Sequence, residues 1–202
     1  MKEEKKGKKI WAIVENGCTL LKGFVFYGAY HSDWRNQLVH IFFVPAIFTS
    51  ILAFLSRVKI NSSLDLSQIA AGVYAITFIK MEPGAGIPYA AVIALMQYIA
   101  THYLKQRPKL SLAMNITGWI AQFFSHAFFE RRAPALLDDP FQALHSSVFF
   151  VWLEVLFFFG YKPELKKELD VLISKKKAEL DERKGEAPGK KDSPLFHKNT
   201  DD

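Results

Sequence analysis

The chain has 202 residues, half of them apolar, and a formal net charge of +6. This length fits one domain, and the single cysteine, Cys18, excludes an internal disulfide. The positive charge does not indicate a nucleic-acid partner, because no basic face interleaved with aromatic residues accompanies it. The charges concentrate in residues 1–9 and 162–202, whereas the middle of the chain consists of apolar blocks with short polar breaks, which is the layout of a membrane protein.

The apolar blocks predict helices in chain order. Four blocks approach the roughly 20 residues needed to cross a bilayer, and each predicts a spanning helix: residues 38–55, 87–104, 110–129 and 141–159. Residues 68–79 are too short to cross alone, and the following segment 80–88, with two prolines and two glycines, predicts a turn or a broken helix. We therefore expect an all-α, polytopic membrane helix bundle of about four spanning helices plus a short or broken helical segment.

Composition divides the chain into parts of different character. A basic N-terminal segment, 1–25, precedes a membrane-embedded domain, 26–161. Residues 162–184 carry Leu and Ile at helical spacing among Lys and Glu, which predicts a C-terminal amphipathic helix on the cytosolic side. Residues 185–202 lack this periodicity and predict a disordered tail. With both polar termini in the cytosol the number of crossings is even, so 68–79 is not counted as an independent span.

The histidines are the residues that suggest chemistry. Five of the six lie within or beside the apolar blocks: His31, His40, His102, His126 and His145. Ionisable residues inside a membrane are costly and usually mark a site or a pathway. On one helix His31 and His40 would face opposite directions. Asp33, however, predicts an N-cap that starts a helix at Trp34, which leaves His31 free to fold back toward Asn36 and His40.

A second polar group lies at the end of the apolar block 110–129. His126 and Glu130 share one helix face at a spacing of four, and Gln122 extends that face by one turn. The pair could bind a metal ion or form a helix-surface hydrogen bond. Imidazoles and carboxylates are the ligands of oxygen-activating iron sites. The sequence contains no zinc-binding cysteine box, phosphate-binding loop, dinucleotide fingerprint or G-x-S-x-G motif.

Three motifs resemble those of a known family. They are Y-H…N…H followed by F-V-P, the long G-W-I-x-Q-F…H-x-F-F-E-R-R-x-P-A-L-x-D, and F-x-x-x-E-x-L-F-x-x-G-Y. Over about residues 26–161 the chain resembles the fungal 2-hydroxy fatty acid dioxygenase family. The resemblance implies an Fe(2+)-dependent enzyme of the endoplasmic reticulum membrane that uses O₂ to shorten 2-hydroxy fatty acids by one carbon, in phytosphingosine degradation.

The resemblance also implies a set of site residues. It makes His31, His40, His102 and His126 the metal ligands, and His145 and His197 are not counted among them. Asn36 and Glu130 are candidate catalytic residues; Glu130 could bind the metal or hold a ligand histidine in place. Arg131 and Arg132 could bind the substrate carboxylate or simply flank a membrane helix. The expected partners are the 2-hydroxy fatty acid, O₂ and membrane lipid, and no protein partner is indicated.

His102 fits the expected helices poorly. If 87–104 and 110–129 are straight antiparallel helices, His102 lies near their shared turn, roughly 20 Å from His126. Either the segment from 105 to about 115 is not a simple turn, or the two histidines do not share one metal shell.

Two other classes of protein compete with the dioxygenase interpretation. A non-catalytic lipid-binding or membrane-shaping protein could use its histidines only for hydrogen bonds between helices. A di-iron hydroxylase or desaturase would carry H-x-x-H or H-x-x-x-H clusters, and this sequence has neither spacing.

Overall fold

The computed structural model describes residues 19–131 and 140–186, which form helices and no strand. The α-helices are α2 (Thr19–Tyr30), α3 (Trp34–Leu55), α4 (Leu66–Met81), α5 (Pro83–Ile99), α6 (Pro108–Ser125), α7 (Pro140–Phe158) and α8 (Pro163–Glu186). Two π-helical turns, η1 (Ala100–Leu104) and η2 (His126–Glu130), extend α5 and α6. The all-α prediction is confirmed, and each predicted helix is present within a few residues of its expected bounds. The sequence pattern does not predict α2, which begins inside the segment 1–25.

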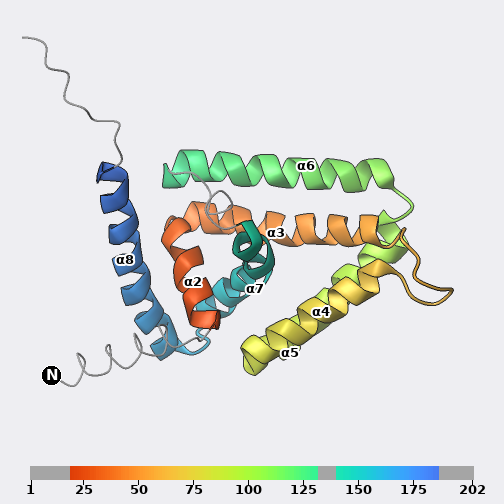
Figure 1. The fold of residues 1–202 in the computed structure, drawn as a ribbon, viewed down its shortest axis with the longest axis horizontal. Helices are drawn as coiled ribbons and strands as arrows, with labels where there is room; N and C mark the ends of the chain where they lie inside the picture. Colours follow the sequence, from red (N-terminus) through yellow and green to blue (C-terminus); the bar gives the residue numbers. More distant parts are fainter. Residues whose placement is uncertain (1–18, 132–139, 187–202) are drawn as a thin grey trace, which may run out of the picture.

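Helices α3 and α6 lie side by side along most of their length (Figure 1). Gly118 of α6 permits this close approach, because a Cβ atom at that position would meet the side chain of Ile47 on α3. Nearby, the Asn115 side-chain amide donates a hydrogen bond of 2.9 Å to the Ser50 hydroxyl. Helices α3 and α6 together position the residues of the candidate site.

Helices α4 and α5 form a hairpin that turns at a single residue, Glu82 (Figure 1). The predicted turn or broken helix over 80–88 is therefore wrong in extent, since α5 already begins at Pro83. Proline is favoured at the first helical position because it has no N–H to leave unpaired, and the Glu82 carboxylate caps the new helix by accepting from the Ala85 N–H. Gly86 lies against the backbone of α4 at Phe78, where a Cβ atom would not fit.

The core is formed mainly where α7 packs against the other helices. Phe78 and Phe149 stack with ring centroids 4.7 Å apart, and Tyr89 stacks on Trp152 at 5.2 Å. The Tyr89 hydroxyl also donates to the Val148 carbonyl at 2.6 Å. These large buried aromatic rings supply much of the apolar surface that folding removes from water.

The C-terminal helix α8 packs against α2 (Figure 1). Leu169 and Leu172 are buried, and Ile173 lies against Gly28 of α2. The expected amphipathic helix over 162–184 is thus present as α8. The predicted disordered tail lies outside the described residues from 187 onward.

Two of the described helices are long and apolar enough to cross a membrane. They are α3 and the continuous helix formed by α5 and η1, Pro83–Leu104. Helix α4 and the segment Ser147–Phe158 of α7 are apolar but shorter. The expectation of about four spanning helices is not confirmed by this criterion.

Candidate metal centre

The chain reverses direction sharply between α2 and α3. Asp33 caps α3 by accepting from the backbone N–H of Arg35 at 2.9 Å, as its place before Trp34 predicts. Hydrogen bonds from Arg35 hold the pKa of the Asp33 carboxyl at about 2, below its ordinary value, so the cap is ionised. His31 lies in the short connection before this cap and folds back against α3.

Backbone carbonyls fix the orientation of two imidazoles. His31 Nδ1 donates to the Tyr27 carbonyl at 2.7 Å, and His40 Nδ1 donates to the Asn36 carbonyl at 2.9 Å. A carbonyl oxygen can only accept, so Nδ1 carries the proton in each neutral ring and Nε2 keeps a free lone pair. This backbone support is the arrangement commonly seen behind metal-binding histidines.

His126 completes the group from the opposite side. It is the first residue of η2, where α6 widens from α-helical to π-helical spacing. Such π-helical turns are rare and occur often at functional sites. The preceding residue, Ser125, donates from its hydroxyl to the Asn36 side-chain oxygen at 2.6 Å and thereby anchors this turn to α3.

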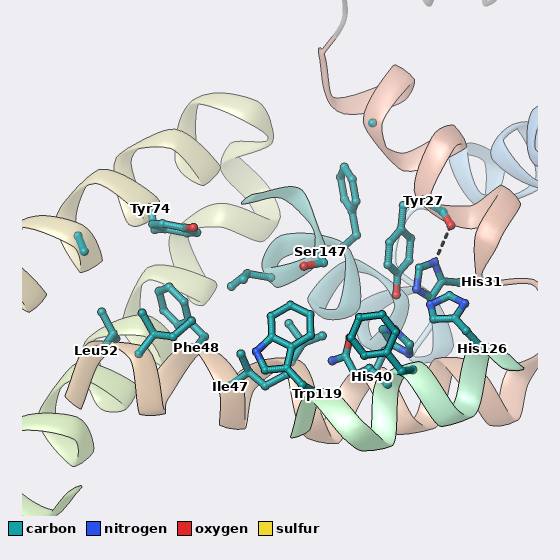
Figure 2. Close-up of a pocket in the computed structure, with 18 of the residues that line it drawn as sticks. Tyr27, His31, His40, Ile47, Phe48, Leu52, Tyr74, Trp119, His126 and Ser147 are labelled. Carbon is teal, nitrogen blue, oxygen red and sulfur yellow. Dashed lines mark hydrogen bonds between the residues drawn. The ribbon is translucent and has the colours of Figure 1, made fainter. Parts of the chain in front are cut away.

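The three imidazoles converge on one point (Figure 2). The ring centroids of His31 and His40 are 4.3 Å apart, those of His31 and His126 4.7 Å, and those of His40 and His126 4.9 Å. One nitrogen from each ring can be chosen so that all three atoms lie within 4.8 Å of one another, and all three residues are buried. Among the described residues this cluster can hold a metal ion.

The environment of the cluster disfavours a positive charge on His31. Burial, followed by the neighbouring His40 and His126, lowers the pKa of His31 well below its ordinary value of 6.5. A neutral imidazole is the form that binds a metal ion, because a protonated ring has no free lone pair. The donor set therefore fits a transition-metal ion such as iron, copper, nickel or zinc.

Glu130 lies beside the three-histidine cluster and forms hydrogen bonds to the residues that flank His31. Its carboxylate accepts from the Ser32 hydroxyl at 2.9 Å, the Asp33 N–H at 2.8 Å and the Asn36 side-chain amide at 3.1 Å. These bonds tie the end of η2 to the start of α3, on either side of His31. Of the two roles open to Glu130 in the sequence, the hydrogen bonds match that of a residue that positions the ligands.

Three other predicted site residues lie elsewhere or outside the described chain. His102 is in η1 at the far end of α3, where Arg57 donates to the Lys105 carbonyl at 2.8 Å, and its own Nδ1 contacts the Tyr98 carbonyl at 3.1 Å. The structure therefore does not bring His102 to the cluster, which agrees with the second alternative left by the helix geometry. Arg131 is exposed and ends η2 in a left-handed conformation, with φ 51°. Arg132 lies outside the described residues.

An apolar cavity of about 270 Å³ opens beside the histidines and runs along α3 (Figure 2). His31, His40 and His126 line one end, and Leu52 and Tyr74 lie at the other. Of the four phenylalanines at positions 123, 124, 128 and 129, which flank His126 in the sequence, Phe123 lines the cavity.

Gln122 is a site residue whose role the sequence does not reveal. It lines the cavity one turn before His126, and its side-chain nitrogen is buried with no hydrogen-bond acceptor among the described residues. A buried amide donor without a partner is uncommon in proteins and requires an explanation. Its position on the face of His126 was visible in the sequence, but the missing partner could only be found in three dimensions.

The fold and the site define an all-helical protein with a buried three-histidine cluster, suited to a metal ion, at the end of an apolar cavity. The chain belongs to the Mpo1-like family, described as 2-hydroxy-palmitic acid dioxygenase Mpo1-like, which it matches over residues 19–159. It is 35% identical over 147 residues to the 2-hydroxy-palmitic acid dioxygenase MPO1 of Saccharomyces cerevisiae, covering 72% of this chain and 84% of that protein. The family resemblance inferred from the motifs is confirmed. No solved structure matches the chain.

Proposed function

We propose that the chain is an Fe(2+)-dependent dioxygenase of the endoplasmic reticulum membrane that oxidatively shortens 2-hydroxy fatty acids by one carbon, as a step of sphingolipid degradation. The observation that carries the proposal is the convergence of three buried histidines at one end of an apolar cavity. Similarity to the yeast dioxygenase supports the substrate class.

His31, His40 and His126 would hold the iron, which would supply the site with the capacity to activate O₂. Three imidazole ligands bring no negative charge to a divalent ion in a buried site, and the nearby Glu130 carboxylate is already engaged in three hydrogen bonds. An anionic 2-hydroxy carboxylate would provide that negative charge. The ligand set therefore favours an acid over a neutral lipid as substrate.

Gln122 would recognise the polar end of the substrate. Its unpartnered side-chain nitrogen lines the cavity beside the cluster and can donate to a carboxylate oxygen. Arg131 does not line the cavity, so we assign the carboxylate contact within the described residues to Gln122. The apolar walls of α3 would exclude water from the reacting carbons.

The overall reaction balances without an external reductant. A 2-hydroxy acid and one O₂ would give the acid one carbon shorter, CO₂ and water, with cleavage of the bond between C1 and C2. Substrate carbon supplies all the electrons that reduce O₂. The proposal therefore requires one O₂ consumed for each shortened acid formed.

The exposed surface supports a membrane location. Large apolar side chains lie outward on several helices, including Phe42 at 72%, Ile120 at 62% and Phe128 at 63% exposure. An apolar surface of this kind marks contact with lipid or with another protein. Together with the two apolar helices long enough to cross, it supports association with a membrane. Within the proposal, residues 26–161 lie in the membrane as a multi-pass domain and both termini lie in the cytosol.

The test is anaerobic purification in detergent, metal analysis, and incubation with ferrous iron, O₂ and 2-hydroxypalmitate. We expect the wild-type protein to bind iron and release the acid one carbon shorter, and His126→Ala to lose both properties. His102→Ala should keep its iron, because His102 lies apart from the cluster. A wild-type protein with neither metal nor turnover would favour the lipid-binding alternative, which needs the cavity but no iron.

A further inference from the structure

The cavity follows one face of α3 away from the metal centre. Its lining on this helix runs from His40 through Val44, Phe48 and Leu52 to Leu55. Fifteen residues of α-helix at 1.5 Å each make this wall about 22 Å long. That length is comparable to an extended palmitoyl chain, and beyond His40 the wall offers only apolar side chains.

Tyr74 of α4 lies at the end of the cavity far from the histidines (Figure 2). Its ring contacts three other rings: Phe48 at 4.9 Å, His145 at 4.8 Å and Phe78 at 5.5 Å between ring centroids. Tyr74 is half-buried, and movement of its ring would disturb these three neighbours. Tyr74 therefore forms a wall at this end of the cavity.

Ala70 lines the cavity one helical turn before Tyr74. It is the smallest side chain that α4 contributes there, and it leaves space between α4 and the end of α3. Val73, on the same helix, points outward with 54% of its surface exposed and does not line the cavity. The two positions thus offer a matched pair for testing the length of the cavity.

We infer that Ala70 and Tyr74 set the longest acyl chain that the site accepts. The inference rests on the proposed function and adds the orientation of the substrate. The carboxylate lies at the histidines, the chain extends along α3, and its methyl end meets Tyr74 beside Ala70. Shape at the far end of the cavity, rather than chemistry at the metal, then selects chain length.

The experiment compares wild type, Ala70→Phe and the control Val73→Phe on 2-hydroxy acids shorter and longer than 2-hydroxypalmitate. Each methylene kept out of an apolar cavity lowers affinity about fourfold. We expect Ala70→Phe to reduce kcat/KM for long acids relative to short acids by about fifteenfold if two methylenes are displaced, and Val73→Phe to behave as wild type. The ratio of kcat/KM for long acids to kcat/KM for short acids is measured on one preparation of each protein, so the fraction of active protein cancels.

A change in the opposite direction completes the test. Tyr74→Leu removes the ring from the end wall and should move the preference toward longer acids. Displacement of a fluorescent fatty acid measures the same preference without turnover. If wild type shortens 2-hydroxypalmitate but neither variant changes the chain-length profile, the inference is wrong and the proposed function stands. If the wild-type protein neither turns over nor binds any acid, the proposed function is wrong, and the inference about chain length is wrong with it.

Discussion

The side-chain nitrogen of Gln122 is a buried donor that lines the cavity beside the histidines and has no acceptor within the part of the chain that the structure describes. If it binds the substrate carboxylate, Gln122→Leu removes one hydrogen bond to a charged group. Such bonds contribute about 1.5–3 kcal/mol, so we expect KM for 2-hydroxypalmitate to rise tenfold or more, with a smaller effect on kcat. Steady-state kinetics on the purified protein measures the change.

Two comparisons isolate the role of Gln122. Gln97→Leu makes the same substitution on α5, where Gln97 donates to the Ser67 hydroxyl and does not line the cavity, and it should leave KM unchanged. Hexadecanol, which has no carboxylate, should bind equally well to wild type and Gln122→Leu. An equal loss for the acid and the alcohol would mean that Gln122 only shapes the cavity.

At the residue scale, the sequence identifies candidate metal ligands but does not show which of them come into contact in the folded chain. The Asp33 cap and the spacing of Asn36 and His40 predict that His31 can fold back, and the structure agrees. The contact of these residues with His126 depends on the packing of α6 against α3, which no local pattern encodes. His102 enters the predicted ligand set by resemblance alone, and the structure places it at the other end of α3.

At the scale of elements, the hydrogen bonds of Glu130 connect η2 to the start of α3. Glu130→Gln keeps the shape of the side chain but removes the negative charge that strengthens its three hydrogen bonds. We expect the free energy of unfolding to fall by about 1–3 kcal/mol and iron affinity to fall about 10–100-fold. Thermal unfolding and iron titration measure these changes.

The control for Glu130→Gln is Glu164→Gln, which alters an exposed carboxylate on α8 that pairs with the exposed Lys167. It should change neither quantity, since exposed ion pairs contribute little. A folded Glu130→Gln protein that binds no iron at all, like His126→Ala, would instead make Glu130 a ligand.

Element boundaries are predictable where a local signal sets them. Asp33 starts α3, and the Glu82–Pro83 pair starts α5, because capping and the proline ring act on the adjacent backbone. Prolines and glycines further along 83–88 suggest a longer break, but packing of Gly86 against α4 stabilises the helix there. The π-helical turn at His126 has no such local signal.

At the scale of the whole molecule, a metal ion would join three separate segments: the connection after α2, helix α3 and the turn η2. Binding to the folded state alone stabilises it by about 2.7 kcal/mol when free metal is 100 times Kd. For a chain of this size we expect chelation to lower Tm by roughly 5–10 °C. Circular dichroism melts with and without chelator measure the shift.

The same melt on His126→Ala should show no dependence on chelator, because the third segment no longer contributes a ligand. Equal shifts in both proteins would place the stabilising metal elsewhere.

Apolar block lengths predict four spanning helices, and two helices of the described chain meet a simple criterion of length and apolarity, so the number of spans stays a prediction. Burial in a helix bundle and exposure to lipid select the same side chains, so sequence alone does not separate them.

His126 lies far along the chain from His31 and His40, and this separation sets the order in which the three metal ligands become available during synthesis. His31 and His40 leave the ribosome early, whereas His126 follows 86 residues after His40. Chains fold progressively from the N-terminus as they emerge, so α2 and α3 would present only two imidazoles for much of translation. The complete centre exists only after α6 docks on α3. Iron loading would therefore be a late maturation step, one that follows helix assembly.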